Sequence, residues 1–360
     1  MALTTPFARS MRAFAHPAVR YIGARTASPQ AWFATGFAGD GAVVCDVALP
    51  GRGHGFAKHL RTGAVVAFGR RPGTFATVFD PATGQPLKTI AAADDRRFCG
   101  HGLFARNGAV LIATELEYST GDGILGLYDS GDGYRRIGEY RSGGLDPHEI
   151  LLLPDSVILV VANGGILTDP DAPGIKLNRD SMESSLAYID TRDGAMLARL
   201  RLPDEYAQLS LRHMAMVQDG TVAVAMQYEG PSADCVPLVA THRHGDKALA
   251  LLAAPDPGLS RLRNYCGSVA VDTASRVLAV TSPVGSVTAF WDLPSRRFIG
   301  VAEMSDVCGL AATGRDGEFV ITSGLGGAAT VKAVERAAHS VSDGALAAAR
   351  WDNHLLPIGV

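Results

Sequence analysis

The segment GHGFAKHLRTGAVVAFGRR, at residues 53–71, holds the pattern that decides the fold. It reads as a short apolar strand, a polar turn and a second apolar strand, and its β-branched and aromatic residues favour strands over helices. Three further segments repeat the pattern with its histidine: GHGLFARNGAVLIATELEY (100–118), PHEILLLPDSVILVVANGG (147–165) and RHMAMVQDGTVAVAMQYEG (212–230). Two more repeat it with the histidine replaced: GSVAVDTASRVLAVTSPVG (267–285) and CGLAATGRDGEFVITSGLGG (308–327).

A second recurring feature lies in the latter half of these units, where an aromatic residue or Ile precedes an Asp at a turn. An Asp in this place can accept hydrogen bonds from backbone amides of its own turn, so the feature indicates a hairpin. It occurs at Phe79-Asp80, Tyr128-Asp129, Ile189-Asp190 and Trp291-Asp292.

The repeat has the length of a propeller blade. His54, His101 and His148 follow one another at intervals of 47 residues, and the longer interval of 65 residues to His213 fits an insertion at 166–185. Four strands in roughly 40–50 residues make one blade of a β-propeller. We therefore predict an all-β, single-domain, seven-bladed β-propeller.

The predicted propeller covers residues 20–357. Its approximate blades are 20–50, 51–98, 99–146, 147–206, 207–262, 263–303 and 304–357. The C-terminal WDNHLLPI (351–358) is expected to supply a late strand that closes the ring, because an open ring would leave unpaired strand edges. Residues 1–19 are expected to be a disordered segment or the remnant of a targeting region.

The composition is that of a folded chain with many tight turns. Apolar residues make up 47% and charged residues 19% of the 360 residues, and 41 of them are glycine. A formal net charge of −3 gives no reason to expect nucleic acid as a partner. No stretch of about 18 apolar residues is present, so no membrane span is expected. The five cysteines are scattered without a CxxC pair, which indicates buried thiols and leaves one disulfide open.

The four recurring histidines are expected to meet. In a propeller the first strand of each blade lies innermost, so equivalent positions on successive first strands form a ring around the channel. His54, His101, His148 and His213 should therefore share one height at one mouth of the channel. Imidazole is the commonest biological ligand of zinc, copper and iron, and we predict a site for one of these metals, or for haem, on these four residues.

Polar residues are expected to surround this ring. The second strand of each blade runs back to the same mouth, and polar residues follow each histidine after about 14–17 positions. The insertion carrying Asp169, Asp171 and Lys176 should lie on the same face, and Arg52, Arg71 and Arg212 can offset the charge of an anionic ligand. The predicted ligand-binding or outer residues are Arg52, Arg71, Glu115, Glu149, Asn163, Arg212, Gln227, Ser268 and Asp306.

Two other interpretations of the histidines stay open. They can be a repeated architectural tie between neighbouring blades, which the glycines of GHG would suit, or they can bind substrate or act as acid and base. His59, His242, His244 and His354 fall outside the register and are not expected to be primary ligands, although WDNH can bring His354 near the site. No Gly-rich phosphate loop, HExxH or GxSxG motif is present, so no catalytic residue is assigned.

Several phrases together resemble one bacterial family, domain of unknown function 1513, over about residues 21–356. They are PGRGHG (50–55), RRPGTFATVFDPATG (70–84), GHGLF (100–104), GYRRIGEY with SGGLDPHE (133–149), VVANGGI (160–166), LRHMA (211–215), QYEGP (227–231), GSVAVD (267–272), DVCGLA (306–311) and WDNHL (351–355).

The resemblance implies a seven-bladed propeller exported through the twin-arginine pathway. It also implies neighbouring genes for imelysin-like lipoproteins and dihaem-peroxidase-like proteins, which are the expected partners, and a role in periplasmic iron acquisition. The family supplies no established catalytic residues. This sequence departs from the family at its start, where arginines occur without the apolar run of an export signal, so a cytoplasmic location is the alternative.

The hypothesis that follows is a periplasmic propeller that binds a transition metal or an iron-containing ligand at the histidine ring. One alternative is a lactonase-like or oxidase-like propeller enzyme that uses the same histidines. Another is a docking platform without chemistry. Single histidine substitutions should abolish turnover in the enzyme, whereas the platform should tolerate the loss of all four.

Overall fold

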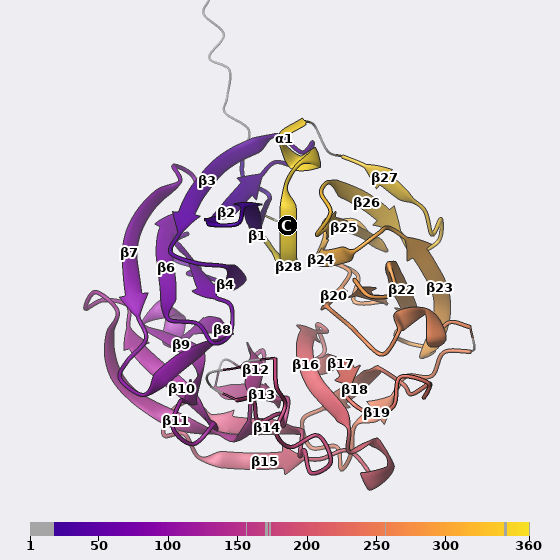
Figure 1. The fold of residues 1–360 in the computed structure, drawn as a ribbon, viewed down its shortest axis with the longest axis horizontal. Coiled ribbons are helices and arrows are strands. Elements are labelled where there is room, and N and C mark those ends of the chain that lie inside the picture. The colour runs from indigo at the N-terminus through magenta and orange to yellow at the C-terminus, as the bar shows by residue number, and fades with distance from the viewer. Residues whose placement is uncertain are drawn as a thin grey trace, which may run out of the picture.

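The computed structural model describes residues 18–155, 157–169, 172, 174–255, 257–341 and 344–359. It contains seven four-stranded antiparallel sheets arranged in a ring, which confirms the predicted all-β, seven-bladed propeller (Figure 1). The expectation for residues 1–19 falls on a segment of which residues 1–17 lie outside the described part. No helix among the described residues is long and apolar enough to cross a membrane.

Each blade is one sheet with its strands in chain order from the axis outward, apart from the first blade. The first contains β28 (Arg350–Pro357), β1 (Tyr21–Ser28), β2 (Ala31–Phe37) and β3 (Val43–Leu49). The second contains β4 (Gly53–Lys58), β5 (Val65–Gly69), β6 (Phe75–Asp80) and β7 (Gln85–Ala91), and the third β8 (Arg96–Ala105), β9 (Val110–Glu117), β10 (Asp122–Asp129) and β11 (Arg135–Leu145).

The remaining four blades follow the same plan. The fourth contains β12 (Pro147–Leu152), β13 (Ile158–Asn163), β14 (Ser185–Asp190) and β15 (Met196–Leu200), and the fifth β16 (Leu209–Met216), β17 (Thr221–Tyr228), β18 (Val239–Arg243) and β19 (Ala250–Leu251). The sixth contains β20 (Ser268–Val271), β21 (Val277–Ser282), β22 (Val287–Asp292) and β23 (Arg297–Glu303), and the seventh β24 (Val307–Ala312), β25 (Glu318–Ser323), β26 (Ala328–Lys332) and β27 (Ala338–Ser340).

The ring is closed by the last strand pairing with the first. β28 runs antiparallel to β1, from Tyr21 opposite Pro357 to Thr26 opposite Arg350, and is the innermost strand of the first blade (Figure 1). The sequence boundaries put this strand in the seventh blade, at 304–357, whereas the seventh sheet ends at β27. Pairing between the two chain ends leaves no open edge at the seam of the ring.

The apolar content of a strand depends on its distance from the propeller axis. Middle strands pack against neighbouring blades on both faces, so they read as continuous apolar runs, as in VVAFG of β5, which is buried throughout. The outer strand β7, QPLKTIA, is exposed at all positions except Ile90. Large side chains such as Trp291, Tyr188 and Phe68 are fully buried between the sheets.

Helical segments are short and lie in the connections. They are η1 (Arg106–Gly108), η2 (Asp204–Tyr206), η3 (Ser260–Leu262) and α1 (Gly344–Ala347). The long connection between β13 and β14 is tied to itself, because Asn178 accepts a hydrogen bond from the amide of Leu167 at 2.7 Å and donates one to the carbonyl of Gly165 at 2.9 Å. It is tied to the fifth blade by an ion pair between Lys176 and Glu229.

Candidate metal centre

Five histidines from five innermost strands meet on the propeller axis. They are His54 of β4, His101 of β8, His148 of β12, His213 of β16 and His354 of β28. In nine of the ten pairs of these rings the centroids are between 4.3 Å (His213 to His354) and 6.3 Å (His54 to His213) apart. The structure therefore brings together the four histidines of the sequence prediction and adds a fifth.

An irregularity in strand pairing accompanies each of these histidines. In β4, His54 and Gly55 together oppose one residue of β5, and in β12 His148 has no partner between the pairs of Pro147 and Glu149. β8, β16 and β28 break register at or beside their histidines in the same way, whereas β20, which has none, pairs regularly. A β-bulge bends its strand and re-aims a side chain, so these bulges help to direct the imidazoles toward the axis. β24 has a similar break without a histidine.

The glycines of the GHG motif let neighbouring blades approach at the cluster. A Cβ on Gly55 would lie 2.6 Å from the carbonyl oxygen of Gly100, and a Cβ on Gly100 would lie 2.7 Å from Cδ2 of His54. Gly100 also has a φ of +103°, in the region that side chains rarely adopt. Both positions therefore require glycine if β4 and β8 are to bring their histidines together.

His354 occupies a central place that the sequence pattern did not reveal. Its ring centroid lies 4.3 Å from that of His213, 4.6 Å from that of His54 and 4.8 Å from that of His101. It has a φ of +78° within a break of the β28 to β1 pairing, between Trp351 and Leu355. A left-handed residue that is not glycine costs energy and concentrates at functional sites. The sequence pattern did not predict His354 as a ligand because β28 lies outside the repeat. Assigning β28 to the first blade as its innermost strand would have placed His354 at the cluster.

Burial keeps all five imidazoles neutral at pH 7. It lowers the pKa of His101 to about 3 and lowers the pKa of His54 although the carboxylate of Asp352 opposes the change. It also lowers the pKa of His148, His213 and His354 well below the ordinary value. Neutral imidazole is the form that binds metals.

Carboxylates outside the cluster lie near Nδ1 of three of the rings. Nδ1 of His54 lies 3.1 Å from Oδ1 of Asp352. The two oxygens of Glu149 lie 3.7 Å from Nδ1 of His101 and 3.5 Å from Nδ1 of His213. At 3.1 Å the carboxylate of Asp352 accepts the Nδ1 proton of His54 and leaves its Nε2 lone pair for a metal. The two Glu149 distances are longer than a hydrogen bond, so Glu149 acts on His101 and His213 through its charge.

The other two rings have different outer contacts. Oγ of Ser268 lies 3.4 Å from Nδ1 of His354, and a hydroxyl can donate or accept there. Arg212 donates to Nδ1 of His148 at 3.2 Å, which places the ring proton of His148 on Nε2. His148 is therefore the ring least prepared to bind a metal through Nε2.

Several ring nitrogens in the cluster have no hydrogen-bond partner among the described residues. They are Nε2 of His101, His148 and His354 and Nδ1 of His213, all buried. A buried polar atom left without a partner costs about 1–3 kcal/mol, so four in one place are expensive to maintain. A bound metal ion would satisfy those nitrogens that carry a lone pair, which excludes Nε2 of His148.

The spacing of the nitrogens fits a metal ion. One nitrogen from each of His54, His101 and His148, and one from each of His101, His213 and His354, lie within 4.8 Å of one another. Nitrogens bound to one ion in tetrahedral geometry at 2.0–2.1 Å lie about 3.3–3.4 Å apart, so nitrogens at the upper limit of this spacing need to move about 1.4 Å closer. The cluster can therefore hold a metal ion, and His101 belongs to both groups.

Two acidic residues that the sequence analysis missed organise the mouth of the channel above the cluster. Asp352 pairs with Arg52 and, at 2.8 Å, with Arg70. Asp146 pairs with Arg71 and, at 2.7 Å, with Arg212. Burial alone would raise the pKa of both carboxyls, but the guanidinium groups, joined at Asp352 by the contact with His54, hold each pKa below its ordinary value. Both acids sit in the WDNH and LDPH phrases, next to a histidine of the cluster.

Two cavities flank the cluster along the axis. The mouth cavity, of about 240 Å³, has His54, His148 and His213 on its wall together with Arg70, Arg71 and Arg212. The inner cavity, of about 130 Å³, is lined by His101, His213 and His354 and by apolar residues further along the innermost strands. The histidines therefore form a partition across the channel. Gln227 lines the mouth cavity and donates to the carbonyl of Cys266 at 3.1 Å.

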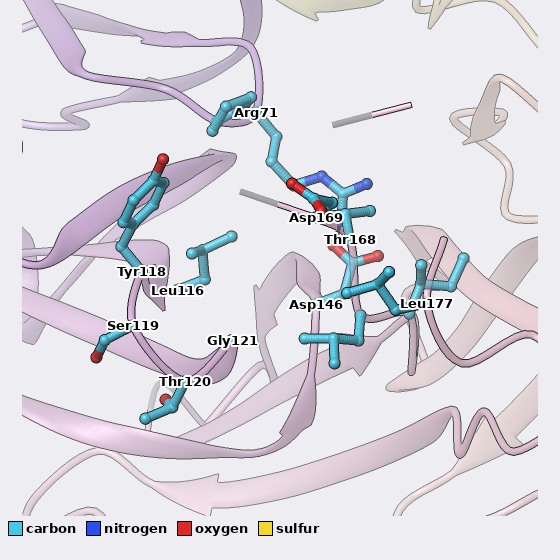
Figure 2. A pocket seen from close by; sticks show the side chains of 13 residues that line it. Arg71, Leu116, Tyr118, Ser119, Thr120, Gly121, Asp146, Thr168, Asp169 and Leu177 are labelled. Atoms are coloured by element: carbon cyan, nitrogen blue, oxygen red, sulfur yellow. Dashed lines mark hydrogen bonds and ion pairs between the residues drawn. The ribbon is translucent and has the colours of Figure 1, made fainter. Parts of the chain in front are cut away.

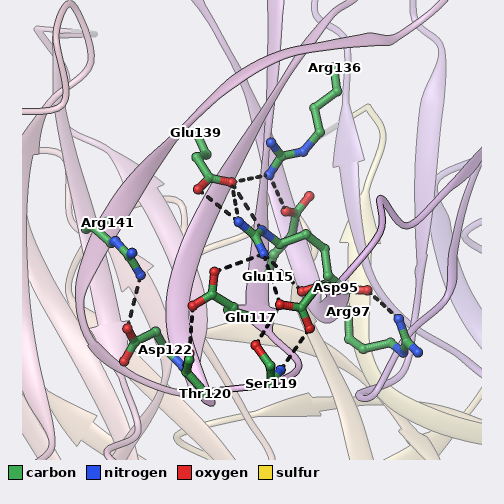
Figure 3. Close-up of polar contacts among 11 residues, drawn as sticks. Asp95, Arg97, Glu115, Glu117, Ser119, Thr120, Asp122, Arg136, Glu139 and Arg141 are labelled. Atoms are coloured by element: carbon green, nitrogen blue, oxygen red, sulfur yellow. Dashed lines mark hydrogen bonds and ion pairs between the residues drawn. The ribbon is translucent and has the colours of Figure 1, made fainter.

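The structure does not bring Glu115, Asn163 or Asp306 to the histidines. Glu115 is buried in the third blade, where it contacts the hydroxyl of Tyr128 and, at 2.8 Å, Arg136 (Figure 3). Asn163 donates to the carbonyl of Ser142 at 3.0 Å, and the backbone of Asp306 bonds to Ser286 and Gly324. These polar residues stabilise blades and loops, which explains why a varied set follows the histidines.

A separate pocket of about 170 Å³ lies beside the mouth and contains none of the histidines (Figure 2). Its wall is largely apolar, with Leu116 from the third blade and Leu177 from the insertion, and Figure 2 shows Arg71 reaching across it toward Asp146. Asp169 lines the pocket, whereas Asp171 lies outside the described residues.

The cysteines take no part in the cluster. All five are free thiols, and all except Cys235 are buried. Burial raises the pKa of Cys266 and of Cys308 to about 12, so these thiols are inert at neutral pH.

Comparison with known proteins supports the fold and gives the family. A solved structure of Kuenenia stuttgartiensis hydrazine synthase superposes with a TM-score of 0.63, covering 90% of this chain and 99% of that chain at 13% identity. At that identity the similarity concerns the fold alone. No curated protein matches the sequence significantly. The model of a family described as a protein of unknown function, DUF1513, matches residues 47–358, and the chain belongs to this family.

Proposed function

We propose that this protein is a metal-binding propeller that holds one transition-metal ion among the five histidines on its axis. The observation that carries the proposal is the convergence of buried, unpartnered imidazole nitrogens within one ion's reach. A purely architectural tie would use these nitrogens in hydrogen bonds between blades, since most buried polar groups have a partner.

The chemistry of the cluster favours a bare ion. Neutral imidazoles suit zinc, copper and iron, and the carboxylates of Glu149 and Asp352 increase the basicity of the rings they contact. In nine of the ten ring pairs the centroids lie only 4.3–6.3 Å apart, so an ion fits among them whereas a haem macrocycle does not. Iron, copper and zinc ions are therefore the candidate ligands, and haem is disfavoured.

The family resemblance supports a biological setting for this site. We propose a periplasmic location reached by twin-arginine export, and iron as the native metal in a role linked to iron acquisition. The corresponding partners would be imelysin-like or dihaem-peroxidase-like proteins. Twin-arginine export suits such a site, because that pathway carries folded proteins with their metal already bound.

The test is elemental analysis of tag-free protein purified from the native host, beside a His101→Asn variant and a His59→Gln control. His101 belongs to both nitrogen groups, whereas His59 is buried outside the cluster and accepts hydrogen bonds from its own turn. We expect about one equivalent of metal in the wild type and in His59→Gln, and little in His101→Asn.

A folded wild type that binds no iron, copper or zinc, even after anaerobic reconstitution, would overturn the proposal. The histidines would then return to an architectural or acid–base role. Metal retained at full stoichiometry and affinity in His101→Asn would also contradict it, because the ion would have to lie elsewhere.

A further inference from the structure

The mouth cavity is distinct from the histidine cluster in its charge. Six basic side chains of the described residues lie around this mouth and form ion pairs with three carboxylates. Asp352 is shared by Arg52 and Arg70, Asp146 by Arg71 and Arg212, and Glu229 by Lys176 and Arg179. Basic groups therefore outnumber the carboxylates with which they pair here, in a protein whose formal net charge is −3. A concave site with charge of one sign concentrates ligands of the opposite sign.

The charged residues of the cavity wall are more uniformly basic than those of the mouth as a whole. Arg70, Arg71, Lys176 and Arg212 line it, and no carboxylate of a described residue does. Each of the three shared acids is therefore turned away from the space that its basic partners face. A cavity with this wall is prepared for an anion.

One buried atom of a residue that lines the cavity lacks a hydrogen-bond partner. Arg212 is only 4% exposed, and its Nε has no hydrogen-bond partner among the described residues. Its Nη1 is already bonded to Asp146 at 2.7 Å. An unsatisfied N–H of a buried guanidinium is costly, and a carboxylate oxygen is its best complement.

The size of the cavity limits the ligand. About 240 Å³ is more than one small inorganic ion needs and less than the roughly 300–1,000 Å³ of pockets for drug-sized molecules. Its cationic groups come from the second blade, the fifth blade and the insertion, so one charged centre cannot contact all of them. Guanidinium groups bind carboxylates through paired N–H donors.

We propose that the mouth cavity is a binding site for a small organic anion with two or three carboxylates. The ligand's carboxylates contact Arg212, Arg70 and Lys176, and the cavity binds the ligand whether or not the histidines hold a metal. Because the wall includes His54, His148 and His213, the bound anion lies directly against the cluster.

The structure offers a matched pair of double variants for the test. Arg70→Gln/Lys176→Gln removes two cations from the cavity wall but leaves Asp352 with Arg52 and Glu229 with Arg179. Arg52→Gln/Arg179→Gln removes the other partner of the same two acids, and neither residue lines the cavity. The two variants change net charge equally, so a difference between them reports the cavity itself.

Isothermal titration of citrate into protein stripped of metal on a chelating resin, at low ionic strength, is the experiment. We expect the cavity variant to bind citrate at least about tenfold more weakly than the wild type, since it loses two charge-assisted contacts. The control variant should stay within about threefold. Inorganic phosphate should bind the wild type at least about tenfold more weakly than citrate does.

The proposal fails if the wild type binds no citrate, if both variants lose affinity equally, or if phosphate binds as well as citrate. Thermal melts of both variants verify that they are folded. The metal proposal is tested separately by elemental analysis. Citrate binding without metal binding would support only the anion site in the cavity. Metal binding without citrate binding would support only the metal site in the cluster.

Discussion

The imidazole of His354 lies 4.3 Å from that of His213, centroid to centroid, although one belongs to the closing strand and the other to the fifth blade. The contact depends on the break in the β28 to β1 pairing and on the left-handed backbone of His354. Ring closure and assembly of the cluster are therefore coupled. Without β28 in the first blade, the centre of the cluster would be missing.

His354→Asn is expected to lower metal affinity by at least about tenfold more than His148→Asn, an effect of the size seen when a ligand or its support is lost. The reason is that His354 is central, whereas the proton of His148 is held on Nε2 by the contact of Arg212 with Nδ1. Competition with a chromogenic chelator measures both affinities. Equal losses would show that His148 rotates into the site and that the outer contact does not decide its role.

Gly100→Ala is expected to destabilise the protein by about 2–4 kcal/mol and to impair metal loading, because the new methyl group adds a clash to an unfavourable backbone conformation. A Cβ there would lie 2.7 Å from Cδ2 of His54, at a φ of +103°. Gly63→Ala is the control, since Gly63 has a φ of +77° and nothing within 4 Å of its added Cβ. Backbone strain is common to both variants, whereas the contact with His54 arises only in Gly100→Ala. Comparing their free energies of unfolding in urea therefore separates the two effects. Similar losses in both would contradict the packing argument.

The repeat predicts the ring because each blade presents the same strand order, so histidines at equivalent places on four inner strands come together at the axis. The sequence pattern put these histidines at the strand starts, whereas β8 and β16 begin several residues before His101 and His213. Spacing alone could not place His354, whose strand comes from the other end of the chain. It also could not separate Glu149, which reaches His101 and His213, from Glu115, which lies over Gly126 and pairs with Arg136. Side-chain direction at a bulge or strand end depends on the neighbouring blade, which the local sequence does not contain.

The metal-free protein is expected to lose stability as the pH falls below about 6.5, the ordinary pKa of histidine. Burial lowers the pKa of the cluster histidines, to about 3 for His101, so the folded state stays unprotonated while the unfolded state binds protons. Stability from this source is full above about pH 6.5 and is lost as the pH falls, by about 1 kcal/mol per pH unit for each such histidine.

Urea midpoints at pH 7.5 and 5.5 measure this dependence. The His101→Asn variant should show a smaller decrease, because one buried group no longer titrates on unfolding. His339→Asn is the control, since His339 is an exposed residue paired with Glu335. A decrease that is the same in all three proteins would mean that the cluster histidines do not carry the pH dependence.

Glu149→Gln is expected to lower metal affinity by about 10–100-fold without removing a ligand, because the carboxylate lies beside two rings and its charge stabilises a cation bound there. Its oxygens lie 3.7 Å and 3.5 Å from Nδ1 of His101 and His213, and a neutral amide removes the negative charge that favours a cation among these rings. Glu139→Gln is a matched control, since Glu139 is similarly half-buried but pairs with Arg96 and Arg136 (Figure 3). Chelator competition should separate the two variants, and unchanged affinity in Glu149→Gln would show that the charge of Glu149 does not contribute to metal binding.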